Sequence, residues 1–153
     1  MSRNLIIVVI ALAAVVGLGG WFLSGGGSAD VAGHSMVPPD TSQVETGAPI
    51  ADVAVPASID GQAALGETAF NAVCADCHGQ NAAGQNGVAP PLVHKIYEPS
   101  HHGDMAFQLA VQNGVRSHHW KFGNMPPISG LTKSDVGNIV AYVRTLQREN
   151  GIN

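Results

Sequence analysis

The stretch Cys74-Ala75-Asp76-Cys77-His78 decides the fold of this chain. Two thiols three positions apart can each add across a vinyl group of one porphyrin, and the adjoining imidazole then lies beneath the iron. The 153-residue chain contains 2 cysteines, and this motif uses both of them. The motif therefore predicts one covalently bound haem c, attached through Cys74 and Cys77, with His78 as an axial ligand of the iron.

Two other kinds of site can contain cysteines at this spacing. A thioredoxin-like redox pair sits at a strand-to-helix turn of a βαβ pattern, which this sequence lacks. A zinc site would need two further ligands at fixed spacing, and it leaves the histidine directly after Cys77 unexplained. The histidines that could supply those ligands are His94, His101, His102, His118 and His119.

A helix is expected to lead into the motif. It begins near Ser58 or Asp60, either of which can cap it, and continues to Cys74. Gly66 costs about 1 kcal/mol in a helix interior relative to alanine, so its presence favours a close helix crossing that a side chain would obstruct. The apolar face is expected to contain Leu65, Ala69 and Val73, with Gly66 and Phe70 on the adjacent row.

Two further helices are expected after the motif. One covers about 103–113 and stops at Gly114. The last covers about 133–150, opens with the capping-box-like Thr132-x-x-Asp135, and has an apolar face at helical spacing. That face consists of Val136, Ile139, Val140, Val143 and Leu146.

The loop after His78 ends at Ala89-Pro90-Pro91-Leu92. Prolines rigidify the backbone and remove donors, so a neighbouring carbonyl can be held at the free ring nitrogen of His78. Accepting that N–H would fix the tautomer of the imidazole and strengthen it as a ligand. We expect Leu92 to pack on the porphyrin; a plain proline between a loop and a helix is the alternative.

A methionine in a proline-rich loop is the expected sixth ligand. Met125 follows a glycine and precedes Pro126-Pro127. A thioether is a soft, neutral ligand that raises the reduction potential relative to a second imidazole. The alternatives are Met105, which lies in a predicted helix where methionine usually fills gaps in the core, and His118 or His119.

Other side chains near Met125 also bear on the site. Trp120 is expected either to donate its indole N–H to a haem propionate or simply to pack its ring. The pairs His101-His102 and His118-His119 could form a surface metal site if the fold brings them together. Exposed histidine pairs without a carboxylate or thiol at set spacing are usually solvated.

The N-terminus is expected to anchor the chain. Residues 5–23 form a run of 19 residues without a charge. As a helix this run covers roughly 28 Å, about the hydrocarbon thickness of a bilayer. Residues 1–23 therefore predict a single-pass anchor in the inner (cytoplasmic) membrane, and Arg3 favours a haem domain on the periplasmic side. A cleaved signal peptide, cut after Ala29, is the alternative.

Composition separates a linker from the haem domain. Residues 24–58 contain four acidic and no basic side chains and few large apolar ones, which predicts a flexible, disordered linker with a span of about 30–35 Å. Residues 59–153 form the predicted domain and contain six basic and seven acidic side chains, a net of −1, whereas the whole chain carries −4. A near-neutral domain argues against nucleic-acid binding and against strong charge steering towards a partner.

Together these residues resemble class I, cytochrome c-type proteins over about residues 59–151. The resemblance implies an all-α fold around one haem in which the first and last helices cross, Gly66 and Phe70 against Ile139 and Tyr142. It also implies ligation by His78 and Met125 and a hydrogen bond from His78 to the Pro90 carbonyl. The layout is similar to membrane-attached bacterial members. The matching motifs are Gly66-x-x-x-Phe70-x-x-x-Cys74-x-x-Cys77-His78, Pro90-x-Leu92, Gly123-x-Met125-Pro126 and Ile139-x-x-Tyr142.

The expected function is that of a one-electron carrier, not an enzyme, because protein groups fill both axial positions of the iron. The expected partners are redox proteins, namely membrane oxidoreductases or oxidases. Three alternatives remain: a haem subunit of a periplasmic dehydrogenase or oxidase, a haem-based sensor or peroxidase in which Met125 dissociates, and metal handling through the histidine pairs.

Overall fold

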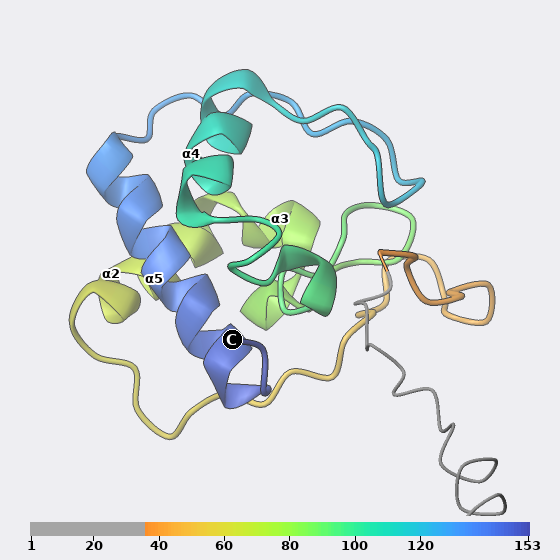
Figure 1. Ribbon diagram of the computed structural model, residues 1–153, viewed down its shortest axis with the longest axis horizontal. Helices are drawn as coiled ribbons and strands as arrows, with labels where there is room; N and C mark the ends of the chain where they lie inside the picture. The colour runs from red at the N-terminus through yellow and green to blue at the C-terminus, as the bar shows by residue number, and fades with distance from the viewer. Residues whose placement is uncertain (1–35) are drawn as a thin grey trace, which may run out of the picture. The chain divides into compact units, whose positions relative to one another are not determined.

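The computed structural model describes residues 36–153, and this part of the chain is helical, with isolated bridges but no strands. The all-α class is therefore confirmed for the described residues. The helices and 3₁₀ turns are arranged as shown in Figure 1. In chain order they are α2 (Gly61–Val73), α3 (Ala75–His78), η1 (Gln80–Ala82), η2 (Lys95–Tyr97), α4 (Asp104–Asn113) and α5 (Lys133–Glu149).

Helices α2 and α5 cross at Gly66, and their contact is the most extensive between helices of the described part. A Cβ atom at Gly66 would lie 1.8 Å from the carbonyl oxygen of Asn138 and 2.4 Å from its carbonyl carbon. One turn further on, the rings of Phe70 and Tyr142 pack with centroids 5.5 Å apart. The predicted crossing of the first and last helices is confirmed, and it requires glycine at position 66.

The buried face of α2 differs from the predicted one. Leu65 is 62% exposed and Val73 is 37% exposed, so the prediction that they lie on the core face is wrong. Because Gly66 must face α5, the neighbouring row of the helix, which carries Leu65 and Val73, turns towards solvent. The buried residues of α2 are Ala63, Gly66 and Phe70.

Helix α5 supplies more of the buried apolar residues than any other described helix, as its apolar pattern predicts. Its capping box is present: the Thr132 hydroxyl accepts from the Asp135 N–H at 3.2 Å, and the Asp135 carboxylate accepts from the Thr132 N–H at 2.8 Å. A reciprocal cap of this kind satisfies two of the helix's unpaired donors. The predicted apolar residues Val136, Ile139, Val140, Val143 and Leu146 are all buried, as is Tyr142.

Two buried polar residues of α5 hold the loop between α3 and α4. The side-chain amide of Gln147 donates to the carbonyls of Leu92 at 2.7 Å and Tyr97 at 3.0 Å. Arg144, only 7% exposed, donates to the same Tyr97 carbonyl at 2.7 Å and to the Asp104 carboxylate at 3.0 Å. The last helix therefore fixes the backbone of the loop that follows the motif.

The described part of the predicted linker is bound to the domain. Asn86 exchanges backbone hydrogen bonds with Gly47 and Ala48, each at 2.9 Å, and its side chain donates to Val44 at 2.7 Å. The side chain of Asn150 donates to the Ala54 carbonyl at 2.8 Å. The prediction of a flexible linker over 24–58 is therefore wrong for 44–54. The segment has the composition of a linker, but Asn86 and Asn150, which are distant in sequence, form hydrogen bonds with its backbone.

The predicted membrane anchor over 1–23, the cleavage point after Ala29 and the start of the linker lie outside the described residues. Among residues 36–153, no helix combines the length and the apolar character needed to cross a bilayer.

Candidate functional site

The two cysteines and His78 lie on a single helical turn. The N–H of Cys74, the residue that ends α2, donates to the Phe70 carbonyl at 2.7 Å, and the N–H of His78 donates back to Cys74 at 2.9 Å. Both thiols are free, with Cys74 half-buried and Cys77 exposed. Burial, helped by the nearby Cys77, raises the pKa of the Cys74 thiol to about 11. The turn therefore presents two thiols and an imidazole within five residues of sequence.

The imidazole of His78 is held by one hydrogen bond. Its Nδ1–H donates to the Pro90 carbonyl at 2.9 Å, so the predicted contact is confirmed. Since a carbonyl can only accept, the proton lies on Nδ1 and Nε2 keeps its lone pair. Burial lowers the pKa of His78, and the bond to Pro90 opposes that shift. His78 is thus a neutral imidazole with one nitrogen available to a metal.

A glycine lets Pro90 approach His78. Gly84 has φ +75°, and a Cβ there would lie 2.5 Å from the Pro91 nitrogen. Its N–H donates to the His78 carbonyl at 2.7 Å, so the backbone on both sides of the Pro90 contact is fixed. Leu92 is half-buried against the core, and its N–H donates to the end of η1 at 2.9 Å.

The loop between α4 and α5 is a braced hairpin, and Figure 1 shows its two arms running side by side. Val115 and Met125 exchange backbone hydrogen bonds of 2.9 and 3.0 Å, and the Asn124 side chain accepts from Ser117 at 2.9 Å. Met125 is half-buried. Met105, the alternative methionine, lies on α4 and is 68% exposed.

Trp120 has a buried donor without an acceptor. The residue is 6% exposed and packs against Phe122 and His94, with ring centroids 5.5 and 5.6 Å away. Its indole N–H has no well-formed hydrogen bond among the described residues, and its weak interaction with the Tyr97 hydroxyl only opposes the rise that burial causes in the pKa of Tyr97. A buried unpaired N–H costs about 1–3 kcal/mol. Trp120 therefore fits a bound group that brings an acceptor oxygen, such as a haem propionate.

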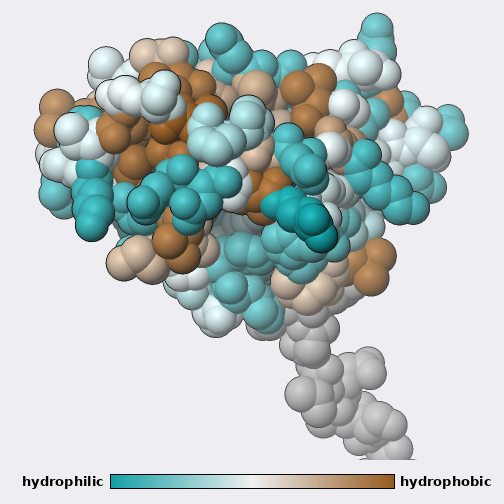
Figure 2. All heavy atoms as spheres, turned by 90° about the horizontal axis from the view of Figure 1, so that it is seen from above, coloured by the Kyte–Doolittle hydropathy of each residue, from teal (hydrophilic) through white to brown (hydrophobic). Residues whose placement is uncertain are grey.

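Apolar side chains also reach the surface near the motif. Figure 2 shows apolar side chains between polar ones on the face seen from above. Val73, directly before Cys74, offers apolar area beside the thiols. Large apolar residues exposed in the described part are Val37, Val55, Leu65, Val73, Val88, Met105 and Leu109. The free imidazole nitrogen, the paired thiols and the indole N–H together fit a covalently attached porphyrin.

The fold brings three of the four paired histidines together. His101 pairs with the Glu98 carboxylate at 2.9 Å, whereas His102, His118 and His119 come together. The two pairs therefore approach each other as the sequence allowed, with His101 outside the group that the other three form. The sequence also did not indicate that Gln147 holds the loop after the motif, because its position on α5 is the same as that of a residue that only packs in the core.

Known proteins resemble this chain in sequence. The sequence model of the Cytochrome c family matches residues 63–147, a range that contains the motif, Pro90, Trp120 and Met125. Cytochrome c-554(547) of Halothiobacillus neapolitanus is 35% identical over 92 residues, which are 57% of this chain and 99% of that protein.

Proposed function

We propose, from the premise that this chain belongs to the cytochrome c family and carries one covalently attached c-type haem, that it transfers single electrons between membrane-associated redox proteins. The haem supplies one-electron exchange between ferric and ferrous iron. The observation that carries the proposal is His78, whose Nδ1–H is held by Pro90 at 2.9 Å while Nε2 stays free beside two thiols.

Each residue of the site has a role in this proposal. Cys74 and Cys77 form the thioether bonds, and His78 is the proximal iron ligand. The Pro90 carbonyl keeps the imidazole in one tautomer and increases its basicity. Leu92 packs against the porphyrin, and Trp120 donates to a propionate, which gives its buried N–H a partner.

We assign the sixth coordination position to Met125. Its backbone is braced by the reciprocal bonds with Val115, and its side chain is half-buried, whereas Met105 is 68% exposed on a helix. With a histidine and a methionine on the iron, no coordination position remains for a substrate. This ligation favours electron transfer over enzymatic turnover.

Optical spectra and redox titration of paired methionine variants test this assignment. Met125→Ala should lose the methionine-to-iron charge-transfer band of the ferric protein and lower the midpoint potential, because a soft ligand that favours ferrous iron is removed. Met105→Ala is the matched control and should keep both. A charge-transfer band that survives in Met125→Ala and disappears in Met105→Ala would reassign the ligand.

Extraction tests covalent attachment. With both cysteines present, acid acetone should leave the haem on the protein, and replacement of Cys74 and Cys77 by alanine should release it. Haem that stays bound to the double variant would show that these thiols do not form the bond.

We further propose that the protein is held in the cytoplasmic membrane by residues 1–23, with the haem domain on the periplasmic side. The uncharged run 5–23 and the leading Arg3 support this placement. Carbonate-washed membranes should retain the haem protein. Recovery of all of it in the soluble fraction would contradict the anchor and point to cleavage after Ala29.

A further inference from the structure

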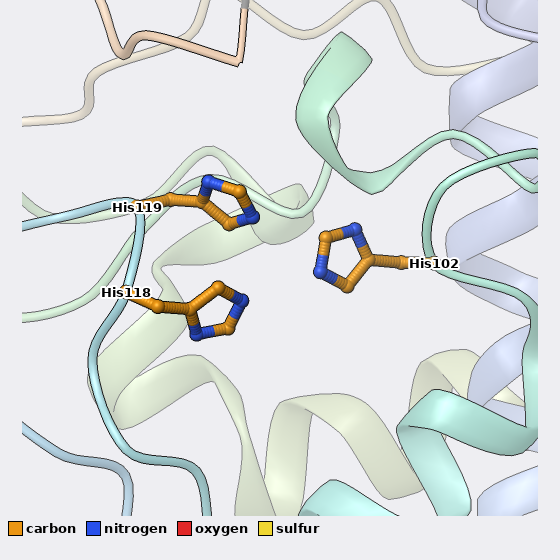
Figure 3. A group of neighbouring side chains, drawn as sticks. All are labelled: His102, His118 and His119. Atoms are coloured by element: carbon orange, nitrogen blue, oxygen red, sulfur yellow. The ribbon is translucent and has the colours of Figure 1, made fainter.

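Three histidines from two loops meet in the described part of the chain. His102 precedes α4, whereas His118 and His119 lie in the hairpin between α4 and α5 (Figure 3). One ligand atom from each ring lies within 4.8 Å of the other two. Figure 3 shows a ring nitrogen of each imidazole turned towards the space between them. The fold thus brings His102 to two adjacent histidines that follow it by 16 and 17 positions in sequence.

Backbone carbonyls fix the tautomers of these rings. The Nδ1–H of His102 donates to the Ile96 carbonyl at 2.6 Å, and that of His118 donates to the Arg116 carbonyl at 2.9 Å. Because a carbonyl only accepts, Nε2 of both rings keeps a lone pair. A hydrogen bond from His119 to the backbone of Met36 acts in the same way. Metal-binding histidines characteristically donate their second ring N–H to such an acceptor.

The surroundings favour neutral rings. Burial is the main effect that lowers the pKa of both His102 and His119. Repulsion from the neighbouring histidines lowers both pKa values further, and the hydrogen bonds to backbone oppose the shift. Arg144 is a cation close to the group, and its guanidinium is paired with Asp104 at 3.0 Å. Both shifts favour the neutral form of the imidazole, which carries a free lone pair.

We propose that His102, His118 and His119 bind a divalent transition-metal cation, Zn²⁺ or Cu²⁺, in addition to the haem iron. Imidazole suits both cations, and three neutral imidazoles leave the fourth position of a tetrahedral site open to water. An ion at the centre of a triangle with 4.8 Å sides lies about 2.8 Å from each corner, about 0.7 Å beyond a normal Zn–N bond. Small side-chain rotations close that gap, since His118 is exposed and His102 and His119 are half-buried.

Titration of the intact haem protein tests the proposal. The full-length protein is stripped with a chelator, and Zn²⁺ is titrated by calorimetry in a phosphate-free buffer at neutral pH. We expect one ion per chain. Replacing His102, His118 or His119 by alanine should weaken binding by about 100-fold or more, since the loss of an outer-sphere partner alone costs roughly 10- to 100-fold. His101→Ala is the matched control and should bind as the parent protein does.

A second measurement needs no variant. Cu²⁺ added to the parent protein should give an electron paramagnetic resonance spectrum with superhyperfine splitting from imidazole nitrogens. The proposal is overturned if neither cation binds, if His101→Ala loses as much affinity as the cluster variants, or if the copper spectrum lacks nitrogen coupling. It is also overturned if a cluster variant alters the ligand bands of the haem, because that imidazole would then serve the iron. The Met125→Ala spectrum is independent of these outcomes, so the two proposals fail separately.

Discussion

Replacing Gly66 by alanine tests the helix crossing on which the fold rests. In an isolated helix this change stabilises by about 1 kcal/mol. In this protein the new methyl carbon would lie 1.8 Å from the Asn138 carbonyl oxygen, where ordinary contact needs at least 3.4 Å. Both atoms belong to backbone or are fixed to it, so α2 and α5 must separate, which loosens the packing of Phe70 on Tyr142. Overpacking costs about 1–3 kcal/mol, and a clash with backbone lies at the upper end of that range. After the gain of about 1 kcal/mol in helix propensity, we expect a net loss of about 2 kcal/mol and a fall in Tm of about 10 °C.

The assay is thermal and urea denaturation of the ferric holoprotein, followed by far-ultraviolet circular dichroism. Gly137→Ala is the matched control, because Gly137 is an exposed residue of α5 where a Cβ would meet nothing within 4 Å. That variant should gain roughly 0.5–1 kcal/mol. The two alanines should therefore move stability in opposite directions. If Gly66→Ala is as stable as Gly137→Ala, the helices do not cross closely at this position.

Four further predictions concern other contacts. Arg144→Met should lower the free energy of unfolding, measured in urea, by about 2–4 kcal/mol because buried carbonyls lose a charged donor. Asp104→Asn should lower it by less than about 1 kcal/mol because 71% of the Asp104 side chain is exposed. Equal losses would contradict the role of the buried network. Trp120→Phe should destabilise the holoprotein by about 1 kcal/mol if the indole donates to a propionate, and a neutral or stabilising effect would argue for an unpaired N–H. Hydrogen bonds from the Thr132 side chain and backbone lower the pKa of Asp135 in the folded protein. The contribution of Asp135 to stability is therefore present above its ordinary pKa and is lost as the pH falls through the lowered value. Asp135→Asn should flatten this acid limb of the curve of stability against pH, and an unchanged limb would exclude the cap. Asn86→Ala should expose 44–54 to limited proteolysis, and equal protection in both proteins would show that other contacts hold this segment.

Local chemistry explains what could be predicted from the sequence. The motif places its three functional groups on one turn because residues four apart on a helix are neighbours. Helix α5 combines a capping box at Thr132 with a long apolar row, and both signals are contained within the helix itself. The family resemblance added the partner of His78, which periodicity alone leaves open.

Features that depend on distant residues could not be predicted in this way. The binding of 44–54 relies on Asn86 and Asn150, and asparagine in a loop looks the same whether or not it holds another segment. The exposure of Leu65 follows from which row of α2 must face α5. The approach of His102 to the hairpin depends on how two loops fold, which no spacing in the sequence reveals.

The hydrogen bonds from Gln147 to the loop between α3 and α4 have a consequence for biosynthesis. Gln147 follows His78 by 69 positions, so the ribosome completes the motif at 74–78 long before it adds the side chain that fastens Leu92 and Tyr97. The nascent chain therefore displays both cysteines before α5, which carries Gln147, has been synthesised. Until then the loop from Leu92 to Tyr97 lacks the side chain that fastens it.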